Sequence, residues 1–421
     1  MSSLGERIRK LRKEKKMTLV DVAGEAMSKG MLSLIENGRS NPSMESLQHI
    51  AKQLGVNVQV LLTEESSEEM KKKLVEIEEE IRKAYNAVSL EEYERLNKAI
   101  QNELEETLKR DLPKTYETAR LRELAGRIYQ NRQQIEKGME YLQIAMNDYQ
   151  ALGLNHNVYK VQLRMVMEHF RAHKYEYALE QLIAYKYEYE KKELLADPLV
   201  QIESDHLEAA LLSAVGKYTE AENLLEEIIS FSKRKNIYYL MDDIYRLASF
   251  HALLNGDEEK RQYTLKKSRQ FAEFTEHHDG LYSSIFVEIH YRNFYLKKHE
   301  EALKMTEELK KAEQFSATED GGYFHLECGS ALYGLGKYEE AYEELIQFKD
   351  TGFAHHPFDL SMMATADAYL ALCLIEKGDP EAALASAEKA KAAVADLPET
   401  PYRHFIQETW EKTIELMSDK L

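Results

Sequence analysis

The chain has 421 residues, of which 43% are hydrophobic and 31% charged, and its formal net charge is −18, so it is long enough for two or more domains. Only seven prolines and eighteen glycines occur, which favours helix almost throughout. No long uncharged apolar run is present and the first residues are charged, so we expect no membrane segment, no signal peptide and a cytoplasmic location.

The first sixty residues contain four short predicted helices, over residues 4–15, 18–26, 28–37 and 43–54. Thr18 stands just before the second apolar run, and Asp21 is three residues after Thr18. This spacing is the pattern of a capping box. Gly38 and Gly55 are placed to end the third and fourth helices. The apolar positions of the four helices predict a small closed core formed by Ile8, Leu11, Val22, Ala23, Leu32, Ile35, Leu47, Ile50 and Leu54. The second and third helices are then a helix-turn-helix pair.

The run LSLIENGRSNPS, from Leu32 to Ser43, resembles the phage-repressor, Cro and Xre class of helix-turn-helix proteins. We therefore predict a lambda-repressor-like DNA-binding domain over residues 1–62. The resemblance implies that the third helix enters the major groove with Lys29, Gly30 and Ser33 toward the base edges. It further implies DNA-backbone contacts by Thr18, Arg39, Ser40 and Asn41. Leu19 departs from the family, which often has Gln after the capping Thr.

Charge separates this head from the rest of the chain. Residues 1–62 carry ten Lys and Arg against six Asp and Glu, net +4, and the remainder carries 46 against 68, net −22. A basic head can dock on phosphate, whereas the acidic remainder repels nucleic acid. We expect the densest positive run, on the first helix, to steer phosphate through Arg7, Arg9, Lys10, Arg12, Lys13, Lys15 and Lys16.

After an acidic polar stretch at residues 63–71, which we interpret as a linker, one short phrase recurs. GKYTEA ends at Ala221 and GKYEEA at Ala341, and phrases in the same slot end at residues 138, 178, 261, 302 and 383. The steps are 40, 43, 40, 41, 39 and 42 residues, and a fixed period of this size indicates a solenoid. The units resemble tetratricopeptide repeats with longer helices. We predict an all-α chain with a right-handed superhelical solenoid over residues 72–398 and a C-terminal capping helix over 399–421.

Small residues and cysteines indicate packing within this array. Small residues recur twelve positions before the end of the phrase in most repeats, at Gly126, Ala209, Ser249, Gly329 and Ala371, where we expect two helices to approach closely. The two cysteines, Cys328 and Cys373, lie in separate repeats without metal-ligand spacing, so we expect both to be packing residues. His277-His278 and His355-His356 are expected to be surface or helix-end residues. No phosphate-binding glycine loop, HExxH, nucleophile elbow or EF-hand loop occurs, so we predict no enzyme, no catalytic residue, no metal and no cofactor.

A solenoid of this kind presents a concave wall built from the first helix of each repeat, which suits an extended peptide. Arg and Lys on that wall can hold a peptide carboxylate, Asn can bond its backbone, and aromatic groups can take apolar side chains. The tetratricopeptide register predicts the peptide-binding residues Arg127, Asn131, Lys160, His206, Asp243, Arg246, Phe250 and Tyr291.

As a whole, the chain resembles the Rap, Rgg, NprR, PlcR and PrgX family of peptide-sensing regulators. Its length and the KGMLSLIENGR stretch are most similar to NprR-like members. The resemblance implies a quorum-sensing transcriptional regulator of Gram-positive bacteria. Such a regulator binds a short secreted and re-imported signalling peptide, forms a dimer or a tetramer, and reads a two-fold symmetric operator in double-stranded DNA.

Two alternatives stay open at this point. Rap-like relatives bind a response regulator and promote loss of its phosphate, and NprR-like proteins combine both roles. In that alternative, helices within residues 70–109 meet the response regulator, with Gln101 or Glu105 orienting water. The other alternative is a phage-type repressor controlled by a protein partner. A specific shift of promoter DNA favours transcription, and faster dephosphorylation of a response regulator favours the phosphorelay.

Overall fold

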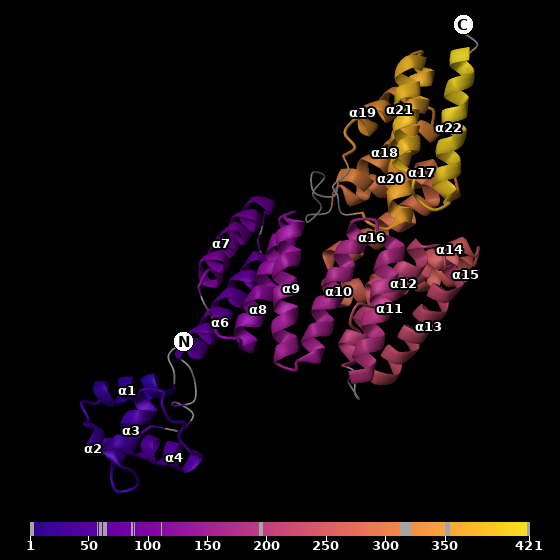
Figure 1. Ribbon diagram of the computed structural model, residues 1–421. Coiled ribbons are helices and arrows are strands. Elements are labelled where there is room, and N and C mark those ends of the chain that lie inside the picture. The colour runs from indigo at the N-terminus through magenta and orange to yellow at the C-terminus, as the bar shows by residue number, and fades with distance from the viewer. Residues whose placement is uncertain are drawn as a thin grey trace. The chain divides into compact units, whose positions relative to one another are not determined.

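The computed structural model describes residues 4–418 except 57, 59–60, 62–64, 86, 88, 111, 193–196, 312–320 and 350–353. All the regular secondary structure in this described part of the chain is helical (Figure 1). The predicted all-α class is therefore confirmed. The chain divides into two compact units, Met1–Met165 and Val166–Leu421.

The first unit begins with the four helices of the head, α1 (Leu4–Glu14), α2 (Leu19–Ala23), α3 (Lys29–Glu36) and α4 (Met44–Gln53). Ser28 and Ser43 cap α3 and α4, since their hydroxyls accept hydrogen bonds from backbone N–H groups in the first turn of each helix. All nine predicted core residues lie in or against one apolar cluster, in which Ile8, Leu32 and Ile50 are fully buried. The predicted core of the head is thus confirmed.

Two glycines set the end of α2 and the close crossing of α1 and α3, which apolar periodicity does not predict. The second helix ends at Ala23 and not at the predicted residue 26, because Gly24 takes φ 54° and ψ −145°, a conformation that a residue with a Cβ avoids. Gly5 lets α1 cross the end of α3. A Cβ at this position would collide with the carbonyl oxygen of Ile35 and lie 2.9 Å from the carbonyl carbon of Glu36.

The rest of the first unit consists of α6 (Glu65–Tyr85), α7 (Leu90–Leu108), α8 (Tyr116–Asn131), α9 (Ile135–Ala151) and the start of α10 (Asn155–Arg171). Helices α6, α7 and α8 enclose an apolar core around Ile77, Leu104 and Leu121. Helix α6 already begins at Glu65, inside the predicted linker of residues 63–71. The reason is that this stretch is rich in Glu, which is a good helix former, and acidic residues suit the positive end of a helix.

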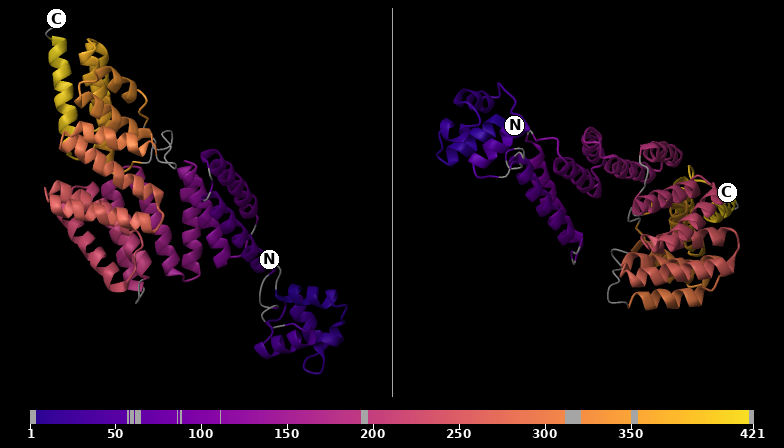
Figure 2. Two further views of the ribbon diagram at one scale, coloured as in Figure 1. Left: turned by 180° about the vertical axis from the view of Figure 1, so that it is seen from behind. Right: turned by 90° about the horizontal axis from the view of Figure 1, so that it is seen from below.

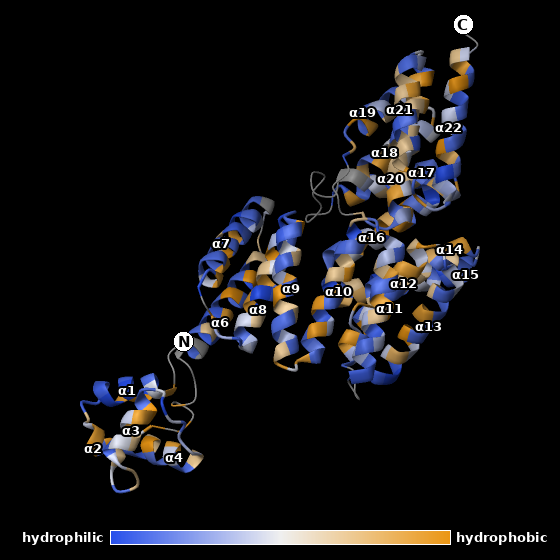
Figure 3. Cartoon of the chain, in the orientation of Figure 1, coloured by the Kyte–Doolittle hydropathy of each residue, from blue (hydrophilic) through white to orange (hydrophobic). Residues whose placement is uncertain are grey.

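The second unit is itself a series of helices packed in pairs, which stay side by side in two further views (Figure 2). After the end of α10, its helices are α11 (Tyr175–Lys192), α12 (Pro198–Ala214), α13 (Tyr218–Lys235), α14 (Met241–Leu254), α15 (Glu258–Phe274), α16 (His278–His290), the π-helix η1 (Tyr291–Tyr295), α17 (His299–Leu309), α18 (Gly321–Gly334), α19 (Tyr338–Leu345), α20 (Pro357–Glu376), α21 (Pro380–Ala393) and α22 (Pro401–Ser418). The last helix begins where the sequence predicts the capping helix. Hydrophilic residues make up much of α7 and α13 (Figure 3).

The repeated phrase marks the start of the second helix of each pair, as its spacing predicts. The residues that end the phrase are all buried, namely Gly138, Ala178, Ala221, Arg261, Ala302, Ala341 and Ala383. The small residues of the preceding helices meet them closely. A Cβ on Gly126 would lie 2.7 Å from Leu142 Cγ and 2.9 Å from the carbonyl oxygen of Gly138. The helix-pair repeat and its close contacts are therefore confirmed.

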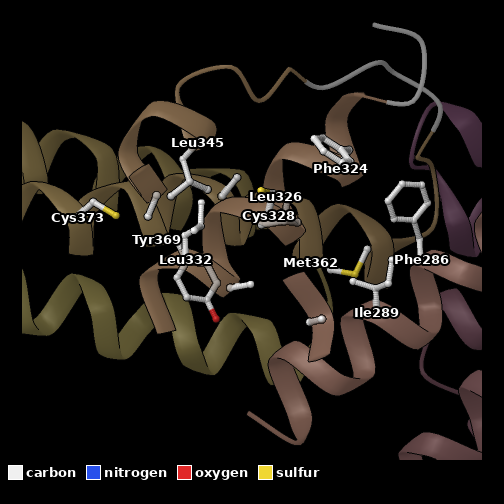
Figure 4. Close-up of a cluster of buried hydrophobic side chains, with 14 of the residues drawn as sticks. Phe286, Ile289, Phe324, Leu326, Cys328, Leu332, Leu345, Met362, Tyr369 and Cys373 are labelled. Atoms are coloured by element: carbon white, nitrogen blue, oxygen red, sulfur yellow. The ribbon is translucent and has the colours of Figure 1, made fainter. Parts of the chain in front are cut away.

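A large apolar cluster among the described residues joins α16 to α22 and contains both cysteines (Figure 4). Burial raises the pKa of the Cys328 and Cys373 thiols to about 12, which leaves both thiols protonated and unreactive at neutral pH. They are packing residues, as predicted.

Among the described residues, one helix has the length and hydropathy of a membrane span, although it carries charged residues. This helix is α20, in which the apolar window has a mean hydropathy of 1.5 and is 61% buried inside the protein. Its residues Met362, Ala366 and Tyr369 belong to the core cluster of the second unit. Packing within the protein therefore accounts for its apolar composition.

Candidate functional site

The predicted base-reading residues lie on the first two turns of α3. Lys29 and Gly30 are exposed and Ser33 is half-buried. In the loop before α4, Arg39 and Asn41 are exposed and Ser40 is half-buried. All six predicted positions in this segment are therefore open to solvent, as contact with DNA requires.

Thr18 performs its predicted local role at the start of α2. Its Oγ1 accepts a hydrogen bond from the backbone N–H of Asp21 at 3.2 Å, and its own N–H donates to Asp21 Oδ2 at 2.6 Å. Hydrogen bonding to Thr18 holds the pKa of Asp21 below its usual value. The capping box fixes the start of the first helix of the helix-turn-helix pair.

The positive run on α1 divides into two groups. Arg12 forms a two-point ion pair with the buried Glu36, with Nε–Oε1 and Nη2–Oε2 distances of 2.7 and 2.8 Å, and its Nη1 donates to the carbonyl of Met17. Arg7 Nε donates to the carbonyl of Leu61 at 3.1 Å. The expectation that Arg12 steers phosphate is wrong, because its guanidinium ties α1 to α3. Exposed cations remain at Arg9, Lys10, Lys13, Lys15 and Lys16.

Three predicted peptide-binding residues belong to the first unit. Arg127 is half-buried on α8, and Asn131 is exposed one turn later on the same helix. Lys160 is exposed on α10. Arg127 and Lys160 form no ion pair with any other residue in the described part of the chain, so their positive charges are available to a ligand.

Four predicted residues of the second unit come together with residues of α20. Arg246 pairs with Asp243 one turn away at 2.7 Å, and both interact electrostatically with His206 on α12. The ring of Phe250 meets that of Phe358 with centroids 4.1 Å apart. We call the set His206, Asp243, Arg246, Phe250, His356, Phe358 and Asp359 the α12–α14–α20 cluster.

Segments about 180 residues apart in sequence meet beside this cluster. The Tyr175 hydroxyl on α11 donates to the carbonyl of His355 at 2.8 Å, and the rings of Phe170 and His356 lie 6.4 Å apart. His356 also caps α20, and its ring lies 5.9 Å from that of Phe250. The array therefore brings the start of the second unit into contact with the start of α20 around these aromatic rings.

The charges of the cluster are set by burial. Burial raises the pKa of Asp359 to about 6, against the opposing influence of Arg246 and His290. Burial also lowers the pKa of His206, and it lowers that of His356 to about 4. For Asp243 burial acts upward, but Arg246 and neighbouring histidines outweigh it and hold its pKa below the usual value. Near pH 7 the cluster thus holds two carboxylates, one guanidinium and neutral imidazoles.

Two members of the cluster have no internal hydrogen-bond partner. The Asp359 carboxylate and the His206 imidazole make no hydrogen bond with any residue in the described part of the chain, and both keep some exposure to solvent. Arg246, by contrast, already has a partner in Asp243. The expected capture of a peptide carboxylate by Arg246 would therefore have to compete with this ion pair.

Tyr291 is the predicted peptide-binding residue on η1, and an internal partner covers its ring. The guanidinium of Arg261 lies 3.6 Å from the ring centroid. Arg261 is itself buried and pairs with Glu258 and Glu288. This arrangement places Tyr291 in the packing of α15 against η1.

Glu105, which the phosphorelay alternative expects to orient water on a phosphorylated partner, already has hydrogen-bond partners within the chain. The Glu105 carboxylate accepts hydrogen bonds from Tyr129, from Gln101 at 3.3 Å and from Lys137 at 3.1 Å. These bonds lower the pKa of Glu105 to about 2. Gln101 is nine-tenths buried beside it. The group therefore joins α7 to α8 and α9.

A cavity of about 660 Å³ opens elsewhere in the second unit. It lies between α12 and α13 and is lined mainly by polar residues such as Asp205, Glu226 and Arg234. None of the predicted peptide-binding residues lines it. Within the described ranges, no three His, Cys, Asp or Glu side chains are grouped as a metal site would require.

The sequence analysis missed His356, Phe358 and Asp359. His356 was expected to be a surface or helix-end residue; it does cap a helix, but it is half-buried against aromatic rings. The His-Pro-Phe-Asp run does carry a signal for a helix start, because Pro follows the cap at the first helical position. Contact between this helix start and Phe250 depends on how repeats stack, which a single sequence does not state.

Comparison with known proteins bears on the head. Residues 8–61 match the family described as Helix-turn-helix. The head is a helix-turn-helix domain. In this helix-turn-helix domain, α2 and α3 are the helix-turn-helix pair that the sequence predicts.

Two curated relatives match through this part of the chain. The HTH-type transcriptional regulator DdrOP3 of Deinococcus deserti is 48% identical over 60 residues, which are 14% of this chain and 46% of the relative. The immunity repressor protein of Bacillus phage phi105 is 40% identical over 65 residues, which are 15% of this chain and 45% of the relative. The match thus spans less than half the length of either relative.

Among solved structures, the chain is similar to NprR in complex with its cognate peptide NprX. The identity is 16% and the TM-score is 0.47, with 68% of this chain and 79% of that chain covered.

Proposed function

We propose that this chain is a cytoplasmic transcriptional regulator that binds operator DNA through its helix-turn-helix head and a short signalling peptide through its repeats. The observation that carries the DNA-binding part is the helix-turn-helix match over residues 8–61. The exposed Lys29 and Arg39 and the net charge of +4 on residues 1–62 support it. One head of this size makes few base contacts, so specific binding needs two heads on a two-fold symmetric operator.

The DNA-binding part is tested with the double substitution of Lys29 and Ser33 by Ala. A promoter fragment and a scrambled duplex of equal length are titrated with the full-length protein. We expect the wild-type protein to prefer the promoter fragment and the variant to bind both duplexes alike, with unchanged circular dichroism. Retention of the preference by a folded variant would contradict the assignment of α3 as the recognition helix.

The peptide-binding part rests on the resemblance of the sequence to peptide-sensing regulators and on the α12–α14–α20 cluster. In this cluster a carboxylate and an imidazole without internal hydrogen-bond partners stand beside the rings of Phe250 and Phe358. A peptide supplies the groups that this set can take, since an ammonium can pair with Asp359 and an apolar side chain can pack on the rings. For Arg127, Asn131 and Lys160 of the first unit, peptide binding stays a separate prediction from the sequence.

The proposed coupling is a shift between conformations of the repeats. The cluster joins α12 and α14 to the start of α20, which in turn touches α10 and α11. A peptide that bridges these helices favours one packing of the repeats over another, by as much as its affinity for the two packings differs. In a dimer or a tetramer, such a shift changes the separation of the heads and hence operator affinity.

The coupling is tested by light scattering after size exclusion and by a promoter gel shift, each with and without short synthetic peptides encoded beside the gene. We expect one peptide to change the oligomer mass and the DNA affinity together. Asp359→Asn should weaken that response. The control Asp367→Asn, on the same helix, removes an ion pair with Lys389 and should leave the response unchanged. DNA binding that ignores every peptide would contradict the peptide role and favour a protein partner.

A further inference from the structure

The outward side of α3 carries a strip without charge. Leu32, Ile35 and Glu36 face the interior of the head, with exposed fractions of 0%, 1% and 4%. With 3.6 residues per turn, the positions opposite these three are Gly30 and Leu34, four residues apart. Leu34 is 44% exposed and lies outside the apolar core of the head. The strip therefore consists of a glycine and a leucine that both face away from the core.

Nothing in the described part of the chain requires glycine at position 30. Gly30 has ordinary helical backbone geometry, and an added Cβ would meet only Ser28 Oγ, at 3.8 Å. Glycine within a helix is nevertheless unfavourable compared with alanine. Helical glycines such as Gly5, Gly126 and Gly329 differ, since a Cβ on any of them would clash with a neighbouring helix. A glycine that the internal packing does not explain is suited to close approach by an outside surface.

The charge around the strip favours DNA as that surface. Lys29 precedes Gly30 on the same helix, Arg39 follows the helix, and residues 1–62 carry a net charge of +4. The second helix of a helix-turn-helix pair lies in the major groove, where it faces base edges. The apolar group that bases present there is the 5-methyl of thymine.

We propose that Gly30 and Leu34 read thymine. Gly30 allows the backbone of α3 to approach the floor of the major groove, and the Leu34 side chain packs on a thymine 5-methyl. This inference rests on the proposed DNA-binding function and names the base chemistry that the head selects. It adds Leu34 to the predicted base-reading positions Lys29, Gly30 and Ser33.

The test uses duplexes that the full-length protein selects from a random pool. In a selected duplex each thymine is replaced, one at a time, by deoxyuridine, which removes only the methyl group. We expect the affinity to fall about three- to tenfold at one or two positions in each half-site, as the loss of one buried methyl contact predicts. The variant Leu34→Ala should bind the thymine duplex more weakly by the same factor and be indifferent to the replacement. The control Val75→Ala, on α6 with Val75 67% exposed, should respond like the wild-type protein.

Gly30→Ala tests the close approach independently. Because the added Cβ has open space, this variant should be at least as stable as the wild-type protein in thermal unfolding. Its affinity for the selected duplex should nevertheless fall about tenfold, because the methyl group separates the helix from the bases. Wild-type affinity in this variant would overturn the role of Gly30.

The remaining outcomes separate the inference from the function on which it rests. Selection of a specific duplex with no effect of any deoxyuridine, or equal sensitivity of Leu34→Ala and the wild-type protein, would overturn the reading of thymine and leave DNA binding intact. A change of oligomer mass in Leu34→Ala, with equal losses on thymine and deoxyuridine duplexes, would assign the strip to a protein contact and overturn the inference. Failure to select any duplex would overturn both proposals.

Discussion

At the scale of single residues, the Arg12–Glu36 pair decides whether the head holds together. Glu36 is 4% exposed and accepts two hydrogen bonds from Arg12. A buried ion pair is costly to break because the remaining charge stays in a poorly solvated place. The pair also shows why a count of basic residues overestimates the number of cations available to DNA. Arg12 lies on the basic helix α1, but its guanidinium is used in a contact within the head.

We predict that Glu36→Ala destabilises the head by about 3 to 5 kcal/mol, the usual cost of leaving one partner of a buried ion pair alone. Hydrogen exchange of α1 to α4 in the full-length protein measures the loss of protection. The control Lys10→Ala removes an exposed ion pair with Glu14, and we expect a change below about 0.5 kcal/mol. Equal protection in Glu36→Ala and the wild-type protein would refute the structural role of the pair.

Asp359 gives the second unit a distinctive response to pH. Its folded pKa is about 6, above the value of about 4 expected for an unfolded Asp, so the folded state binds this proton more tightly. The stabilising contribution of the protonated form is complete below about pH 4 and is lost as the pH rises through 6. His251 and His356 act in the opposite direction. Burial lowers the pKa of both to about 4, so their contribution is lost as the pH falls from 6.5 toward 4.

We predict that Asp359→Asn stabilises the second unit at pH 7.5 by about 1 to 3 kcal/mol and changes little at pH 4, because it removes only the cost of the buried charge. Urea unfolding followed by fluorescence suits this measurement, since the single tryptophan, Trp410, lies on α22. Asp367→Asn, on the same helix, should lose a little stability with its ion pair to Lys389. Equal changes in Asp359→Asn at pH 4 and pH 7.5 would rule out the buried charge as the cause.

At the scale of elements, the repeat is held by small residues where two helices cross. Gly126 faces Leu142 and Gly138 of α9, and Gly329 faces Leu345 of α19 in the same way. Arg261 occupies the equivalent slot in one repeat, where its guanidinium is enclosed by Glu258, Glu288 and the Tyr291 ring. The small-residue rule therefore has an exception, and it falls next to the π-helix η1.

We predict that Gly126→Ala destabilises the first unit by about 1 to 3 kcal/mol, because its Cβ overlaps Leu142 and the backbone of α9. Gly30→Ala is the matched control, since its Cβ meets open space and should cost nothing. Hydrogen exchange of α8 and α9 separates the two variants. Unchanged protection of these helices in Gly126→Ala would show that α9 can move aside at little cost.

At the scale of the whole molecule, charge is divided along the chain. Residues 1–62 carry a net charge of +4 and the remainder −22. Phosphate contacts by the head should make DNA affinity fall steeply with salt, since each neutralised phosphate releases counterions. The acidic repeats should repel nucleic acid at the same time.

We predict that Arg39→Ala weakens binding to specific and scrambled duplexes about equally and reduces the slope of log affinity against log salt by about one. Lys29→Ala should instead weaken binding to the specific duplex more strongly. Fluorescence anisotropy between about 50 and 200 mM salt measures both slopes. A selective loss on the specific duplex in Arg39→Ala would move this residue from the phosphates to the bases.

The helix-turn-helix head, the caps of its helices, the helix-pair repeat and the packing role of the cysteines were all predictable from the sequence. Each depends on local signals, namely capping residues, apolar periodicity and a repeated phrase. The end of α2 at Ala23 and the start of α6 at Glu65 were less predictable. Each depends on residues within a single helical turn, Gly24 in the first case and the helix-forming acids near Glu65 in the second.

Only the tertiary structure decided which polar groups are partners and which are free. Arg12 meets Glu36 across 24 residues, and the start of α20 meets Tyr175 across 180. Such contacts depend on how helices stack, and stacking is set by the sum of many packing interactions with no short signature in the chain. The same holds for Leu34, because the core contacts of α3 as a whole leave its side chain exposed. The sequence by itself therefore determined the kind of protein, and the packing of its helices decided which residues remain available to DNA and to a ligand.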